Sequence, residues 1–234
     1  MPSLRFTIYE ILGYFAPGMV AFAALSIYVW AIFFPHNAFL IDFSLTKEEI
    51  FAFLFLSYSL GHFIQGITNA LPRAEDIAEK SPDNSQLIAS AKSRIALKCG
   101  IDTKTFGIRQ IVSLTQTWML HHGKTDDHDV FLYREGFYRG SSAAYFLLAI
   151  AFLVRGCRGP IAIVGKDFTC NIGGSLMLTL SILAFAISVV FFFRFLRFGN
   201  YRVQNLLASA CLPMESDLDG GTKDNNETSA ETPK

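Results

Sequence analysis

Apolar residues are gathered into four blocks along the chain, and polar or charged segments separate these blocks. The blocks lie at about residues 9–34, 47–71, 138–158 and 174–196. A transmembrane helix needs about 20 mainly apolar residues, because each residue advances the helix by about 1.5 Å and the hydrocarbon core is about 30 Å thick. The pattern therefore predicts four helices that cross a membrane.

Two of the blocks carry signals that define their ends. Thr46 and Glu49 have the spacing of a capping box at the start of the second block, and Pro72 should end that helix because it cannot continue the backbone ladder. The third block is the shortest. It reaches the required length only if residues 137–139 lie at one membrane interface and the Arg155 side chain snorkels to the other.

A proline interrupts the first block. Pro17 has no main-chain N–H, so the carbonyl oxygen of Gly13 loses its helical hydrogen bond. With Gly18 next to it, this predicts a kink in the first helix. Ordinary packing geometry accounts for such a kink without a functional role.

The polar segment between the second and third blocks contains short helical patterns. Asp83 and Gln86 have the spacing to cap a helix of about residues 84–98, which Gly100 would end. A further helix should begin at Asp126 or Asp127 and continue without a break into the third block. These patterns predict a small helical insertion between two transmembrane hairpins.

Another helix in this segment, at about residues 103–122, has an amphipathic pattern. It could pack on its neighbour or lie on the membrane surface. Its apolar face would contain Ile108, Ile111, Val112, Thr115 and Trp118.

Together these elements predict an all-α, polytopic integral membrane protein. We expect a transmembrane hairpin at residues 8–72, a helical insertion at residues 73–140, and a second hairpin at residues 141–212 that ends in a juxtamembrane helix. The tail, residues 213–234, lacks apolar periodicity and should be disordered.

Composition supports the membrane class. Hydrophobic residues make up 51% of the chain and charged residues only 17%, and the mean hydropathy is +0.34. This balance is unlike that of a soluble domain. The net charge of zero also argues against direct binding of nucleic acid, so the lipid bilayer is the expected surrounding.

Basic residues indicate the orientation of the chain. Only four of the 20 Lys and Arg residues fall in the two segments opposite the insertion, namely Lys47, Arg155, Arg158 and Lys166. Short loops that are rich in Lys and Arg stay in the cytoplasm. We therefore expect a multi-pass protein of the cell inner membrane, with both termini and the insertion on the cytoplasmic side.

The second block carries a polar stripe made of Tyr58, His62, Gln65 and Asn69. These residues are four, three and four positions apart, which is the spacing of one helix face. One interpretation is hydrogen bonding between packed spans, worth about 0.6 kcal/mol per contact. The other is a polar path or an oligomer axis, where His62 could titrate near neutral pH.

The predicted topology divides the four cysteines between two compartments. Cys99 and Cys211 would face the cytoplasm, whereas Cys157 and Cys170 would share the loop on the far side. If that side is oxidising, Cys157 and Cys170 could form a disulfide, although both thiols could equally stay free.

Sequence motifs give no support to a catalytic, metal or cofactor site. The segment HHGKTDDHD contains the residue types that bind transition metals. However, adjacent His121 and His122 point in different directions from a helix, and the acidic residues are explained as caps of the next helix. We therefore expect no metal and no cofactor, and an enzyme is the less favoured class.

Three phrases resemble segments of a group of proteins, namely YEILGYFAPG, YSLGHFIQGITN and YREGFYRG. They are similar to segments of uncharacterised small bacterial four-span membrane proteins, some of which are similar to accessory or effector proteins of anti-phage systems. The resemblance implies a homo-oligomeric inner-membrane effector or channel-like protein that responds to a cytoplasmic protein or small-molecule signal. It carries over no catalytic residue. The alternative is a small transporter or an intramembrane enzyme that uses the polar face of the second span.

Overall fold

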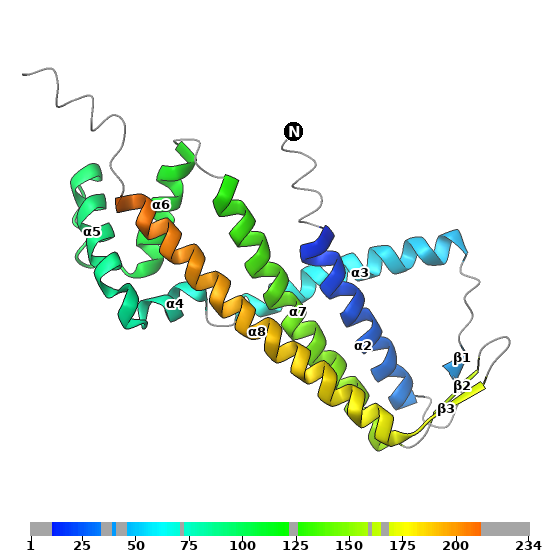
Figure 1. The fold of residues 1–234 in the computed structure, drawn as a ribbon. Coiled ribbons are helices and arrows are strands. Elements are labelled where there is room, and N and C mark those ends of the chain that lie inside the picture. Colours follow the sequence, from blue (N-terminus) through cyan, green and yellow to red (C-terminus); the bar gives the residue numbers. More distant parts are fainter. Residues whose placement is uncertain are drawn as a thin grey trace, which may run out of the picture. The chain divides into compact units, whose positions relative to one another are not determined.

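A computed structural model of the chain describes residues 11–33, 39–40, 46–70, 73–121, 126–158, 161–164 and 169–211 (Figure 1). Four helical segments are long and apolar enough to cross a membrane, namely Gly13–Phe33, Lys47–Thr68, Arg134–Cys157 and Gly174–Cys211. The prediction of a helical chain with four span-length helices is therefore confirmed.

The elements follow one another in a simple order. The helical elements are the π-helical turn η1 (Ile11–Phe15), α2 (Ala16–Phe33), α3 (Lys47–Thr68), α4 (Ala74–Glu79), the 3₁₀ turn η2 (Pro82–Asn84), α5 (Ser85–Cys99), α6 (Ile108–His121), α7 (Asp126–Cys157) and α8 (Gly174–Cys211). The strands are β1 (Phe39–Leu40), β2 (Ile161–Val164) and β3 (Thr169–Ile172).

The three strands form a small sheet that the sequence did not predict. β1 pairs in parallel with β2, and β2 pairs antiparallel with β3, so that Ile161 lies opposite Ile172. The sheet joins the α2–α3 connection to the α7–α8 connection. Strands of two to four residues are too short to show an alternating pattern that could identify them.

Contacts divide the chain into two compact units, which we describe separately. The first consists of Met1–Ile77 and Thr125–Arg202, and the second of Ala78–Lys124 and Val203–Lys234. α8 is one unbroken helix of 38 residues, whose last turns belong to the second unit. The expected span of residues 174–196 and the juxtamembrane helix that follows it thus lie in one continuous helix.

The second unit has its own hydrophobic core. The predicted apolar face of α6 packs against α5 and the end of α8, so α6 packs on its neighbours rather than presenting that face outward. The buried residues of this core include Ala91, Ile95, Ile108, Ile111, Val112, Val203, Leu206 and Leu207.

Of the two short helices of the second unit, α5 begins at Ser85, next to the predicted start near residue 84, whereas α6 begins later than predicted. Pro82 opens the 3₁₀ turn η2 and draws Asp83 into it, so Asp83 does not cap α5 and the predicted cap is wrong. α6 begins at Ile108 rather than near Thr103, and the Thr103 hydroxyl instead donates to the carbonyl of Lys92 in α5. The predicted stop at Gly100 is confirmed, since Gly100 adopts the left-handed conformation with φ 64°.

In the first unit, the start of α3 follows the prediction. Thr46 and Glu49 form the predicted capping box, in which the main-chain N–H of Thr46 donates to Glu49 Oε2 at 2.8 Å. The buried residues of α3 lie only in its second half, and the first half extends away from α2 and α7 (Figure 1). α7 begins at Asp126 and continues unbroken into the third span, as predicted.

Serines connect α7 and α8 within the first unit. The Ser142 hydroxyl donates to the carbonyl of Ser188 at 3.0 Å, and the Ser188 hydroxyl donates back to the carbonyl of Ser142 at 2.7 Å. In a further hydrogen bond between the same helices, the Ser181 hydroxyl donates to the carbonyl of Ala149. These contacts hold the two helices at close range, as small polar residues do in membrane proteins.

Candidate functional site

The three phrases singled out in the sequence meet in the first unit. Residues 13–18 come from η1 and α2, residues 58–69 from α3, and residues 133–140 from α7. Their contacts form a junction of three helical segments, which we call the three-helix junction.

Gln65 lies at the centre of the three-helix junction. Its Nε2 donates to the carbonyl oxygen of Gly13 at 3.0 Å, the group that Pro17 deprives of a helical partner. Gly136 leaves room for this amide, because a Cβ at that position would lie 3.3 Å from Gln65 Nε2. Gly140 packs on Pro17 in the same way, with a Cβ position 3.5 Å from the proline ring. Gly13 lies within the π-helical turn η1, which immediately precedes α2.

α2 and α3 cross with their backbones in contact. A Cβ on Gly18 would lie 1.7 Å from the carbonyl oxygen of Ser57, and a Cβ on Gly61 would lie 1.9 Å from that of Tyr14. Neither distance is compatible with a side chain. Only glycine therefore permits this crossing, which brings the face of α3 that carries His62 up to η1.

His62 and Tyr58 form an aromatic group with Tyr14 of η1. The His62 ring stacks on Tyr14 with centroids 4.0 Å apart, and the Tyr58 ring meets His62 edge-on at 4.5 Å. His62 is nevertheless exposed, and Tyr58 keeps 39% of its surface exposed. Other residues of the same chain therefore cover Tyr58 and His62 only in part.

Asn69, at the other end of the stripe, contacts α7. Its Oδ1 accepts a hydrogen bond from Arg139 Nη2. Gln65 and Asn69 thus make bonds between helices of one chain, whereas Tyr58 and His62 make ring contacts at a surface. The four residues lie on one face, but they do not share one environment.

A buried ion cluster lies beside Asn69, and the sequence analysis missed it. Arg202 donates through Nε to Glu135 at 2.7 Å and through Nη2 to Glu75. Arg202 is 5% exposed and Glu135 is 6% exposed. The partners are 67 and 127 residues from Arg202, so no local spacing could pair them. The position of Glu135 in the phrase YREGFYRG was the available signal.

The ion cluster affects the titration of Glu75, which lies outside the span-length helices. Burial disfavours its charged form, but the positive charge and hydrogen bond of Arg202 outweigh burial and lower the pKa of Glu75 below its usual value. Glu75 therefore stays charged at neutral pH and holds α4 to α8.

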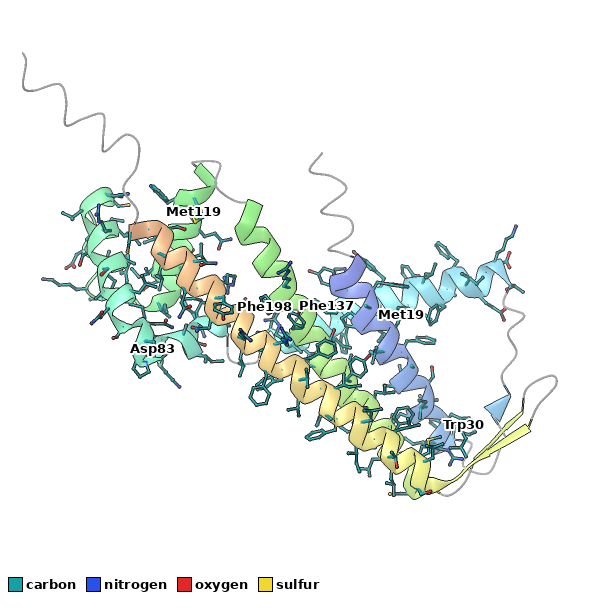
Figure 2. All side chains as sticks on the ribbon, in the orientation of Figure 1. Met19, Trp30, Asp83, Met119, Phe137 and Phe198 are labelled. Atoms are coloured by element: carbon teal, nitrogen blue, oxygen red, sulfur yellow. The ribbon has the colours of Figure 1, made fainter. Side chains whose placement is uncertain are left out.

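Aromatic rings also join α7 and α8. Tyr138 stacks on Phe198 with centroids 5.2 Å apart, and Arg134 lies over the same Phe198 ring at 5.8 Å. Phe137 and Phe198 are labelled in Figure 2 on these two helices.

Arg155, at the other end of α7, does not snorkel as expected. It is 1% exposed, and its guanidinium lies 4.5 Å from the ring centre of Trp30 at the end of α2 (Figure 2). A cation over an indole face is a favourable contact when it is shielded from water. The sequence suggested a solvated charge because Trp30 and Arg155 are far apart along the chain.

The remaining candidate residues contribute little to a site. Cys99 and Cys211 have free thiols. The side chain of Cys170 lies outside the described residues, so the disulfide between Cys157 and Cys170 stays a prediction. Within the described part of the chain, no group of three or more His, Cys, Asp or Glu could hold a metal ion. The side chains of the segment HHGKTDDHD and the tail at residues 213–234 lie outside the described residues.

The class that the fold indicates is therefore a helical protein with four helices long and apolar enough to cross a membrane. Comparison with protein-family models, curated proteins and solved structures finds no match to this chain.

Proposed function

We propose that this chain is a subunit of a homo-oligomeric, non-enzymatic protein of the inner membrane, with both termini in the cytoplasm. It acts as an effector or a channel-like protein, and the cytoplasmic helical insertion receives a protein or small-molecule signal. The exposed position of His62 on a span-length helix carries this proposal. Ionisable residues within a membrane almost always face other helices or water.

The surroundings of His62 support an interface between copies. Phe51, Phe55, Tyr58 and His62 are four, three and four residues apart along α3, and we call them the α3 aromatic face. Phe51 is 71% exposed and Phe55 is 61% exposed. Alternating steps of three and four are the repeat with which packed helices interdigitate. A second copy of α3 would cover this face and shield His62 from lipid.

The alternative, a small transporter or an intramembrane enzyme, has less support. It needs the polar stripe to contact a substrate, but Gln65 and Asn69 are occupied by Gly13 and Arg139 of the same chain. Only Tyr58 and His62 would be left to act on a substrate. Two neighbouring rings at a surface do not make a binding cavity.

Dye release from liposomes that contain the purified protein tests the proposed function. We expect wild-type protein to release dye, and His62→Leu to reduce release while leaving the amount of inserted protein unchanged. Phe63→Leu is the matched control, because Phe63 is the next residue, is 64% exposed and points away from the α3 aromatic face. Equal release by His62→Leu and wild type would contradict the proposed role of His62.

A further inference from the structure

We propose that the groove between α7 and α8 in the first unit binds an anionic phospholipid, with its phosphate on Arg139 and an acyl chain along the apolar walls. The groove has a volume of about 280 Å³. It is lined by Arg139, Ser142, Ala143, Phe146, Ser188, Val189 and Phe192. The site is independent of the α3 aromatic face and does not depend on oligomer formation.

Arg139 supplies the charge at one end of the groove. A guanidinium has five N–H donors, yet among the described residues Arg139 makes one hydrogen bond, to the neutral amide of Asn69. Its Nε is buried and has no hydrogen-bond partner there. The nearby carboxylates of Glu75 and Glu135 are both bound by Arg202. Arg139 thus has donors available for an anion.

The charge balance around Arg139 also favours an anion. Among the described residues, the charged groups that most affect Arg139 are Arg73, Arg202, Glu75 and Glu135. With Arg139 itself, three positive charges face two negative ones, so the cluster has an excess positive charge. A phosphodiester carries one negative charge and accepts two hydrogen bonds from a guanidinium.

The other walls of the groove suit an acyl chain. The hydroxyl hydrogens of Ser142 and Ser188 are already donated to main-chain carbonyls, which leaves Arg139 as the donor among the lining side chains. Phe146 lies seven residues along α7, about 10 Å from Arg139 at 1.5 Å per residue. The groove therefore has a charged end and an apolar end, as expected for a lipid at the membrane interface.

Thermal unfolding in detergent, with phosphatidylglycerol or phosphatidylcholine added, tests this site. We expect phosphatidylglycerol to raise the Tm of the wild type and phosphatidylcholine to have little effect. Arg139→Gln should lower the affinity for phosphatidylglycerol by about tenfold, the loss expected for one charge-assisted contact. Asn69→Ala should keep the lipid effect, because it removes the intrachain bond and preserves the cation.

A second pair of variants tests the groove without touching its charge. Val189→Phe fills the groove and should remove the lipid-dependent rise in Tm. Val190→Phe is the matched control, because Val190 is 59% exposed and lies outside the groove lining. In this variant phosphatidylglycerol should raise the Tm as much as it does in the wild type. The same lipid effect in all variants would overturn the proposal. The proposal would also be overturned if Asn69→Ala lowered the affinity for phosphatidylglycerol as much as Arg139→Gln does. It would likewise be overturned if glycerol phosphate, which has no acyl chain, raised the Tm as much as phosphatidylglycerol does.

Discussion

Gln65 of α3 donates a hydrogen bond to the carbonyl oxygen of Gly13, and Gly13 is the residue whose helical partner Pro17 removes. A side chain from one helix thus replaces a main-chain donor missing from another. Inside a membrane, freed backbone groups must find such partners because no water is present. Pro17 in the first span and Gln65 of the polar stripe in the second are therefore parts of one interaction.

This interaction predicts coupling between Gln65 and Pro17. Gln65→Leu should lower the free energy of unfolding by about 1 kcal/mol, because the Gly13 carbonyl then has no partner. Pro17→Ala restores a main-chain N–H that can bond this carbonyl, so Gln65→Leu should cost less in that background. A double-mutant cycle in detergent measures the difference, and additive effects would show that the two residues act separately.

The crossing of α2 and α3 predicts strong effects at two glycines. Gly18→Ala and Gly61→Ala each place a Cβ within 2 Å of a carbonyl oxygen, and each should lower the free energy of unfolding by at least about 3 kcal/mol. Gly66→Ala is the control, because Gly66 lies on α3 with Gly61 and a Cβ at Gly66 would meet nothing within 4 Å. It should be neutral or stabilising by up to about 1 kcal/mol. The levels of folded protein in membranes test this, and similar levels for all three variants would refute the close crossing.

The buried ion cluster predicts a large effect at Arg202. Arg202→Met leaves the carboxylates of Glu75 and Glu135 buried without a cation, which should cost about 3 to 5 kcal/mol of stability. Replacing both acids by Gln in the Arg202→Met background should recover much of the loss. Arg197→Met serves as the control, because among the described residues Arg197 donates hydrogen bonds only to the hydroxyl of the exposed Tyr201. A loss no larger than that of Arg197→Met would contradict the contribution of the cluster.

Local patterns predicted much of the fold. The apolar blocks predicted the span-length helices, and Thr46, Glu49 and Gly100 predicted local caps, because these features depend on residues close together in the sequence. The cap of α5 and the start of α6 were missed, because Pro82 places Asp83 in a 3₁₀ turn and the Thr103 hydroxyl bonds the carbonyl of Lys92 in α5. At these two places the sequence contains residues that favour a helix start and residues that favour a turn, and it does not show which structure forms.

The site was harder to predict than the fold. The face shared by Tyr58, His62, Gln65 and Asn69 followed from their spacing, but their partners did not, since Gly13 and Arg139 lie on other helices. The contacts of Arg202 and Arg155 were missed for the same reason. A charge in a polar segment looks solvated until the fold brings a carboxylate or an indole ring beside it.

The distribution of basic residues predicts the topology. Reporter fusions after Pro82 and after Gly165 should report opposite sides of the membrane, with Pro82 in the cytoplasm. A cytoplasmic signal from the Gly165 fusion would show that the third span does not cross, and the four-span topology would then be wrong.

Cysteine crosslinking in native membranes tests most directly the central claim, that copies of the chain meet through the α3 aromatic face. The four native cysteines are replaced by serine, and Phe55→Cys is introduced on that face. The control is Ile182→Cys, which is 71% exposed and lies eight residues into α8, as Phe55 lies eight residues into α3. We predict a covalent dimer after mild oxidation for Phe55→Cys and little for Ile182→Cys. Equal crosslinking at both positions, or none at Phe55→Cys, would contradict the account.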